Sequence, residues 1–259
     1  MFRWCTFGLL AGWLSLPLLA RETLKVLFVG NSLTYTNDLP GMLAQLAKAG
    51  GKPALEYDTE MPGGCSLEKH WREGRALAKI QARAWDFVVM QDLSNQALAN
   101  PQSMAQYGKL LAEAAVKQKA KPAFYMTWAW ANQPESQSVI TKAYQSLAQE
   151  AHATLIPAGV AWQAYRRAHP SQNLVTDDRH PDPGGTYLTA CVFYAVLYGA
   201  SPVGLPGEPA KLKAPQARLF QEAAWAAVNA SESSAGGPRT GATRASAGWA
   251  GAIPPGPPD

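Results

Sequence analysis

The fold of this chain is decided by residues 26–34, which read VLFVGNSLT. An unbroken apolar run is typical of a strand buried on both faces of a sheet, and the glycine and serine after it indicate a sharp turn. Ser32 in that turn becomes a nucleophile only where a histidine accepts its proton and a carboxylate orients the histidine. Asp177 and His180, near the other end of the chain, supply both groups. The alternative is that Ser32 merely caps a helix or forms a turn.

Strand-like and helical segments alternate along the chain. Strands are predicted at residues 24–29, 54–59, 86–90, 123–127 and 154–156. Helices are predicted at residues 39–47, 67–84, 103–117, 136–151, 160–168, 187–198 and 212–229. This alternation predicts an α/β fold, a three-layer α/β/α sandwich with a five-stranded, mainly parallel sheet. Residues that follow the strands would then gather at one sheet edge, where such folds place their sites.

The two ends of the chain differ in composition from its middle. Residues 1–20 resemble a signal peptide, with a positive start and an apolar stretch too short for a comfortable membrane span. We expect one domain over residues 21–230, and a disordered Ser/Gly/Ala/Pro-rich tail over residues 231–259. The expected location is periplasmic or secreted, without stable membrane insertion once the signal is removed. An uncleaved anchor is the alternative.

Composition excludes several classes of function. The net charge is +4 with no dense basic run, which argues against a nucleic-acid partner. No His-x-x-x-His, paired Cys-x-x-Cys or Asp-rich loop is present, so the sequence predicts no metal site and no cofactor. Cys65 and Cys191 would remain after export; they either pair or, the favoured reading, stay as buried thiols.

Three sequence blocks resemble those of the SGNH (GDSL-like) hydrolase superfamily. They are the Gly-x-Ser turn at Ser32, the Gly63-Gly64 pair after the second strand, and Asp177-x-x-His180 followed by proline before a late helix. The resemblance covers roughly residues 24–199. It implies a flavodoxin-like fold and an exported serine esterase that works through an acyl-enzyme without a cofactor.

The resemblance also implies a role for each site residue. Ser32 would be the nucleophile, His180 its general base and then the acid for the leaving alcohol, and Asp177 the group that orients the imidazole. The backbone amides of Ser32 and Gly64 would face the developing oxyanion. Asp178 is the alternative to Asp177 as the partner of the histidine.

Two positions depart from the family pattern. Asn31 stands where many members carry aspartate. The third block, usually Gly-x-Asn-Asp, has Leu93 in the place of the asparagine, and leucine cannot donate a hydrogen bond to the oxyanion. Gln91, directly at the end of its strand, or Asn95 would have to supply the missing amide.

Other residues near the expected site allow a structural as well as a functional interpretation. Trp128, with Trp130, is either a stacking platform for a sugar ring or part of the core. His70 is expected to pack or to face solvent on its helix, and Cys65 to be structural.

The predicted substrate is a small-molecule or polysaccharide ester with a short acyl group, such as an O-acetylated carbohydrate. A lysophospholipase or thioesterase is the alternative among esterases. The altered third block leaves open a non-catalytic carbohydrate-binding envelope protein. A glycosidase would need Asp92 and Asp177 to face each other across a sugar.

Overall fold

A computed structural model describes residues 23–234. The signal peptide predicted at residues 1–20, and the tail beyond residue 234, lie outside the described residues.

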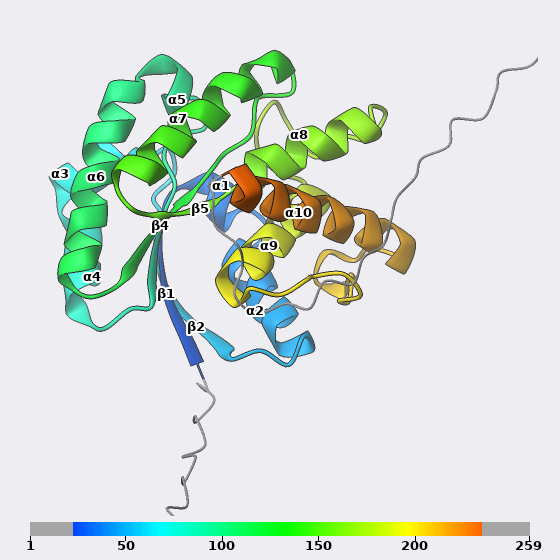
Figure 1. The fold of residues 1–259 in the computed structure, drawn as a ribbon, viewed down its shortest axis with the longest axis horizontal. Helices are drawn as coiled ribbons and strands as arrows, with labels where there is room; N and C mark the ends of the chain where they lie inside the picture. Colours follow the sequence, from blue (N-terminus) through cyan, green and yellow to red (C-terminus); the bar gives the residue numbers. More distant parts are fainter. Residues whose placement is uncertain (1–22, 235–259) are drawn as a thin grey trace, which may run out of the picture.

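A single sheet forms the centre of the molecule (Figure 1). Its strands are β1 (Thr23–Val29), β2 (Ala54–Glu60), β3 (Phe87–Met90), β4 (Lys121–Tyr125) and β5 (Thr154–Ile156). They lie in the order β2-β1-β3-β4-β5, and every pair is parallel. The predicted α/β class and the five strands are therefore confirmed, and the sheet of the described residues is parallel throughout.

Helices cover both faces of this sheet, as Figure 1 shows. They are α1 (Ser32–Tyr35), α2 (Leu39–Ala49), α3 (Leu67–Glu73), α4 (Arg75–Ala82), α5 (Gln96–Ala99), α6 (Pro101–Lys117), α7 (Gln137–Glu150), α8 (Ala158–Ala168), α9 (Pro183–Tyr198) and α10 (Ala214–Ser234), with 3-10 turns η1 (Pro134–Ser136) and η2 (Glu208–Ala210). One layer contains α2, α8, α9 and α10, and the other contains α3, α4, α6 and α7.

Alternate residues of the strands contribute their side chains to two separate hydrophobic cores. In β1, Val26 and Phe28 pack with α2 and α9, whereas Leu27 and Val29 pack with the opposite layer. All four side chains are buried, which explains the unbroken apolar run in the sequence. The two cores hold the strand ends rigidly, so the loops that leave these ends have fixed starting points.

Some boundaries differ from those predicted. The helix predicted at 67–84 is divided at Gly74, which adopts the left-handed φ of +77° that glycine tolerates best. Helix α10 continues to Ser234, so the first residues assigned to the tail, 231–234, are helical. No helix within residues 23–234 is long and apolar enough to cross a membrane.

Candidate active site

The structure brings Ser32, His180 and Asp177 into one hydrogen-bonded chain. Ser32 Oγ lies 2.9 Å from His180 Nε2, and His180 Nδ1 lies 2.7 Å from Asp177 Oδ2. The side chains of His180 and Asp177 are 27% and 52% exposed, so the group opens directly to solvent. An imidazole between a hydroxyl and a carboxylate is the arrangement that nucleophilic catalysis by serine requires.

The serine turn is fixed by its neighbour Asn31. This residue caps the short helix α1, and its Oδ1 accepts a hydrogen bond from Leu33 N. Its Nδ2 donates to the carbonyl oxygens of Cys65, at 2.9 Å, and of Asp92, at 3.2 Å. One buried amide therefore ties the turn after β1 to the loops after β2 and β3.

The loop that carries the histidine is closed on itself. An isolated antiparallel bridge between Val175 and Pro181 joins its two ends. Asp177 Oδ1 accepts hydrogen bonds from the backbone amides of Arg179 and His180, at 2.8 and 2.7 Å. The hydrogen bond from the His180 ring, together with these two amides, holds the pKa of Asp177 well below its usual range. The Asp178 carboxylate makes no hydrogen bond or ion pair within the described residues. Asp177, and not Asp178, is therefore the partner of the histidine ring.

The expectation that Gln91 donates to an oxyanion is wrong. Its side chain is fully buried, and Oε1 accepts hydrogen bonds from Asn31 N at 3.2 Å and from Thr34 Oγ1 at 2.9 Å. Its Nε2 is bonded to the carbonyl of Asp92. Gln91 therefore braces the serine turn from inside the fold, and its fully buried amide is not presented to a substrate.

The glycine turn after β2 leaves a backbone amide free. Cys65 N donates to Pro62 O, and Gly64 within this turn has a φ of +63°. Neither Ser32 N nor Gly64 N has a hydrogen-bond partner in residues 23–234, so both amides can donate a hydrogen bond to an anionic oxygen. Asn95, partly exposed at the start of α5, likewise makes no side-chain hydrogen bond in this part of the chain.

Trp128 belongs to the core and is not a sugar platform. It is 1% exposed and stacks on Trp162, with ring centres 3.7 Å apart and planes at 2°. Its Nε1 donates to Arg179 O at 2.9 Å, which supports the histidine loop from below. Trp130 is partly exposed; its Nε1 donates to Ser94 Oγ, and the Arg179 guanidinium lies 5.3 Å from its ring centre.

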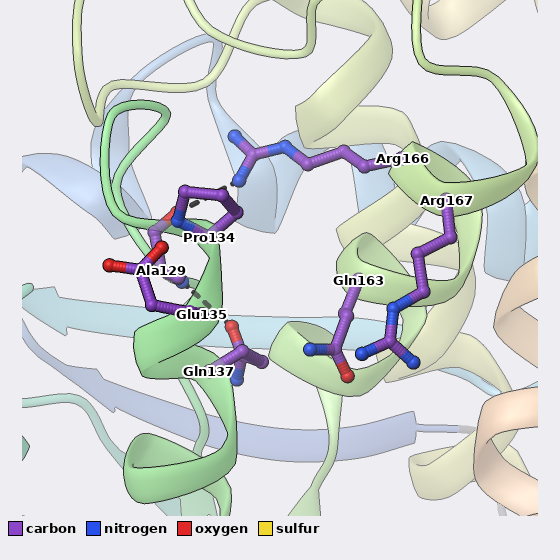
Figure 2. Close-up of a pocket in the computed structure, with 7 residues that line it drawn as sticks. All are labelled: Ala129, Pro134, Glu135, Gln137, Gln163, Arg166 and Arg167. Carbon is purple, nitrogen blue, oxygen red and sulfur yellow. Dashed lines mark hydrogen bonds between the residues drawn. The ribbon is translucent and has the colours of Figure 1, made fainter.

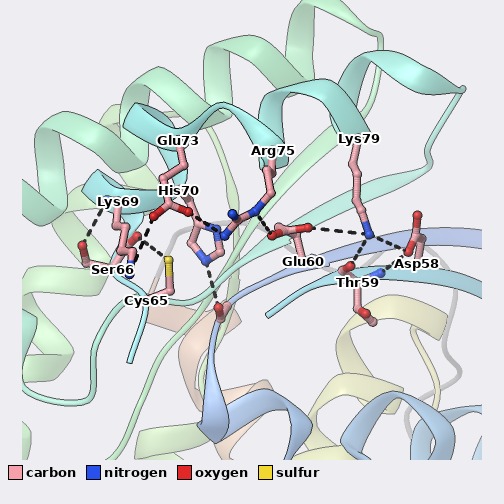
Figure 3. A network of polar contacts seen from close by, with 11 residues as sticks. Asp58, Thr59, Glu60, Cys65, Ser66, Lys69, His70, Glu73, Arg75 and Lys79 are labelled. Atoms are coloured by element: carbon pink, nitrogen blue, oxygen red, sulfur yellow. Dashed lines mark hydrogen bonds and ion pairs between the residues drawn. The ribbon is translucent and has the colours of Figure 1, made fainter. Parts of the chain in front are cut away.

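His70 has a role that sequence reasoning missed. Its ring is buried, and Nε2 donates to the carbonyl oxygen of Gly30 at 2.8 Å, just before the nucleophile turn (Figure 3). Burial lowers the pKa of His70, so the ring is neutral at neutral pH and carries its proton on Nε2. Around it, Glu73, Arg75 and Glu60 form a chain of ion pairs. Nothing in the local sequence distinguishes this histidine from one that faces solvent.

Cys65 and Cys191 are both buried and unpaired, as the favoured interpretation of the sequence expected. Within the described ranges, no group of three or more His, Cys, Asp or Glu residues is arranged to hold a metal ion.

Asp92 is a buried carboxylate beside this site. Its Oδ1 accepts hydrogen bonds from Leu67 N and Leu93 N, at 3.0 and 2.8 Å. Its Oδ2 is buried without a partner among the described residues, as are Thr127 Oγ1 and Tyr144 Oη. Burial raises the pKa of Asp92 to about 6, although the two amides oppose the shift.

This pKa predicts a pH-dependent effect of Asp92→Asn on stability. Above pH 6 the folded wild-type protein carries a buried charge. The free energy of unfolding of Asp92→Asn should therefore be up to about 3 kcal/mol higher than that of the wild type. As pH falls from 6 to 4, the folded wild type takes up a proton before the unfolded chain does, and the difference should narrow. Urea unfolding at several pH values measures this. Asp178→Asn, at an exposed position, is the control. A difference that does not change with pH would contradict the prediction.

Comparisons with known proteins agree with this architecture. No family model and no curated protein matches the chain. A candidate SGNH hydrolase from Slackia heliotrinireducens is 30% identical, over 68% of this chain and 99% of its own, with a TM-score of 0.58. A DUF4886 family protein from Bacteroides uniformis is 20% identical, over 80% of this chain and 95% of its own, with a TM-score of 0.68. The acetyl xylan esterase AlAXEase is 16% identical, over 67% of this chain and 100% of its own, with a TM-score of 0.57. The chain belongs to the SGNH hydrolase superfamily, as its sequence blocks predicted.

Proposed function

We propose that this protein is a serine esterase that removes short acyl groups from alcohols through an acyl-enzyme. The observation that carries the proposal is the chain of hydrogen bonds from Ser32 through His180 to Asp177. The superfamily of this chain and the esterases among the similar structures support an ester as the substrate.

The geometry supports a two-step mechanism. His180 Nε2 takes the proton of Ser32 as Oγ attacks the ester carbonyl, and Asp177 stabilises the resulting imidazolium. The amides of Ser32 and Gly64 hold the oxyanion, with the side-chain amide of Asn95 proposed as a third donor. His180 then gives its proton to the departing alcohol, which leaves an acyl group on Ser32. Water, deprotonated by His180, attacks this acyl group and releases the carboxylic acid.

The proposed substrate is an O-acylated carbohydrate, in chemical terms a short ester on a bulky polar alcohol. The exposed triad favours a bulky alcohol that stays partly in solvent. Tyr35, 46% exposed on the same helix as Ser32, offers an apolar surface beside it. We also propose that the protein acts after export, in the periplasm or outside the cell, on the basis of residues 1–20.

The structure argues against a two-carboxylate glycosidase. Asp92 is 1% exposed and accepts hydrogen bonds from the backbone amides of Leu67 and Leu93, so it cannot face Asp177 across a sugar. A lysophospholipase or thioesterase would share the triad and differ in the acyl group.

Hydrolysis of p-nitrophenyl acetate, butyrate and octanoate, together with labelling by a fluorophosphonate, tests the proposal. We expect turnover of acetate and butyrate, at least about tenfold lower kcat/KM for octanoate, and a single label on Ser32. Preference for octanoate would favour the lysophospholipase or thioesterase. Folded protein that neither turns over any ester nor takes the label would overturn the esterase in favour of a binding protein.

A further inference from the structure

The segment that carries the glycine turn after β2 is tied to Gly30 at both of its ends. Gly30 N donates to Glu60 O at 3.0 Å, where β2 ends, and Gly30 O accepts from His70 Nε2 of α3 at 2.8 Å (Figure 3). Gly64, whose amide holds the oxyanion in the proposed mechanism, lies between these two ends. Because Gly30 stands two positions before Ser32, both bonds limit how far the amides of Gly64 and Ser32 can move apart.

Helix α3 connects the ring of His70 rigidly to the glycine turn. The side chain of Ser66 caps this helix, and His70 N donates to Ser66 O at 2.9 Å. One helical turn therefore separates the ring of His70 from the residue two positions after Gly64. From the serine side, the amide of Asn31 holds Cys65 O at 2.9 Å. The glycine turn is thus fixed at its centre as well as through both ends of its segment.

His70 is suited to act as a permanent donor to Gly30. The residue is 2% exposed, and its bond to Gly30 O is the one side-chain hydrogen bond that it makes within residues 23–234. Burial lowers the pKa of His70 and keeps the ring neutral. A neutral imidazole donates one hydrogen bond without burying a charge, which a lysine or arginine at this place would do.

The loop after β4 is held in a similar way, but it supports the histidine and not the oxyanion amides. Ala129 N donates to Gln137 Oε1 at 2.7 Å, and Ala129 O accepts from Arg166 Nη1 at 2.8 Å (Figure 2). Two residues further on, Ala131 N donates to Asp178 O of the histidine loop. The general base and the oxyanion amides therefore have separate supports, so a change at His70 should reach the amides and leave the base in place.

We propose that His70 is a positioning residue, which sets the alignment of the Ser32 and Gly64 amides through its hold on Gly30. The inference rests on the proposed esterase function, because ester hydrolysis gives these amides an oxyanion to stabilise. The oxyanion forms only after the serine attacks, so the alignment acts on the transition state more than on the bound ester. A displacement of about 1 Å at such a site costs on the order of 100-fold in rate.

His70→Leu and His70→Gln test this role. The amide of His70→Gln can donate to Gly30 O from nearly the place of the imidazole Nε2, whereas His70→Leu fills the site without a donor. We expect His70→Leu to lower kcat for p-nitrophenyl acetate about 100-fold with KM within about threefold, and His70→Gln to recover kcat to within about fivefold of wild type. The acidic limb of the pH profile of kcat/KM, which His180 sets, should not move in either variant.

Gln221→Leu is the matched control for the loss of a buried donor. Gln221 of α10 is 1% exposed, and its Nε2 donates to Leu205 O and Tyr187 Oη, which belong neither to the triad nor to the oxyanion turns. This variant should lower the urea midpoint of unfolding, as His70→Leu does, and keep kcat within about twofold. If His70→Leu does not fold, His70→Asn takes its place, because its amide is too short to reach Gly30 O.

The outcomes separate the positioning role from the proposed function. Active wild-type protein with unaltered kcat in His70→Leu would overturn the role of His70 and leave the esterase standing. Equal losses of kcat in His70→Leu and Gln221→Leu, or no recovery in His70→Gln, would reduce His70 to a contribution to stability and overturn its role. A shift of the acidic limb would place the effect on His180 and overturn it as well. Wild-type protein that hydrolyses no ester would overturn the proposed function, and the role of His70 with it.

Discussion

Ser32→Ala is expected to lower kcat for ester hydrolysis by about 10⁴-fold to 10⁶-fold without loss of the fold. Among the described residues, the hydroxyl is the only group that is hydrogen-bonded to His180 Nε2, at 2.9 Å, so its removal takes away the nucleophile and leaves the oxyanion amides. Ser32 makes no other side-chain hydrogen bond in the described part of the chain, and the free energy of unfolding should change by less than about 0.5 kcal/mol. Steady-state kinetics with p-nitrophenyl acetate and urea unfolding measure the two quantities.

A double variant gives this prediction its sharpest control. Ser32→Ala and His180→Ala should each remove most of the activity, and the combination should be no slower than either alone, because the residues act as a unit. Asp177→Asn should cost up to about 10⁴-fold, since the amide cannot hold the imidazole in the required tautomer. The matched variant Asp178→Asn should stay within about twofold. Full activity in Ser32→Ala, or equal losses at both aspartates, would contradict the assignment.

The fold and the triad could be predicted because their signals are local. Apolar runs mark the strands, and Asp177 and His180 belong to one loop that the Val175–Pro181 bridge closes. The parallel sheet then places Ser32 at the carboxyl edge, where this loop meets it. A short sequence pattern is therefore sufficient to predict a residue's role where its partners are close in the chain or follow strands that end at the same edge of the sheet.

There is a physical reason why the role of Gln91 could not be predicted from the sequence. Strand β3 is buried on both faces, so its sequence has no alternation from which the direction of the next side chain can be read. Gln91 turns inward to Thr34, and Asn95 is left as the candidate donor. For Trp128 and His70 the sequence left two alternatives open, because their partners, Trp162 and Gly30, are distant in sequence.

Asn31→Asp is expected to destabilise the protein by about 3–5 kcal/mol at pH 7, although many members of the superfamily carry aspartate at this position. The amide of Asn31 donates to two buried carbonyl oxygens, those of Cys65 and Asp92. A carboxylate has no hydrogen to donate, so both carbonyls would lose their partner and face a negative oxygen instead. The turn of Ser32 and the glycine turn after β2 would then lose their shared tie.

The sign of the pH dependence separates this mechanism from a general loss of packing. A carboxyl group that faces two carbonyls is easier to protonate than a free one, and the protonated form can donate one hydrogen bond. The destabilisation by Asn31→Asp should therefore be smaller at pH 4 than at pH 8. Asn132→Asp, at an exposed loop position, should change the free energy of unfolding by less than about 0.5 kcal/mol at either pH. Urea unfolding of the three proteins measures these differences. A loss below 1 kcal/mol at pH 8 would mean that the two carbonyls find other donors, and that the amide of Asn31 does not hold the three loops together.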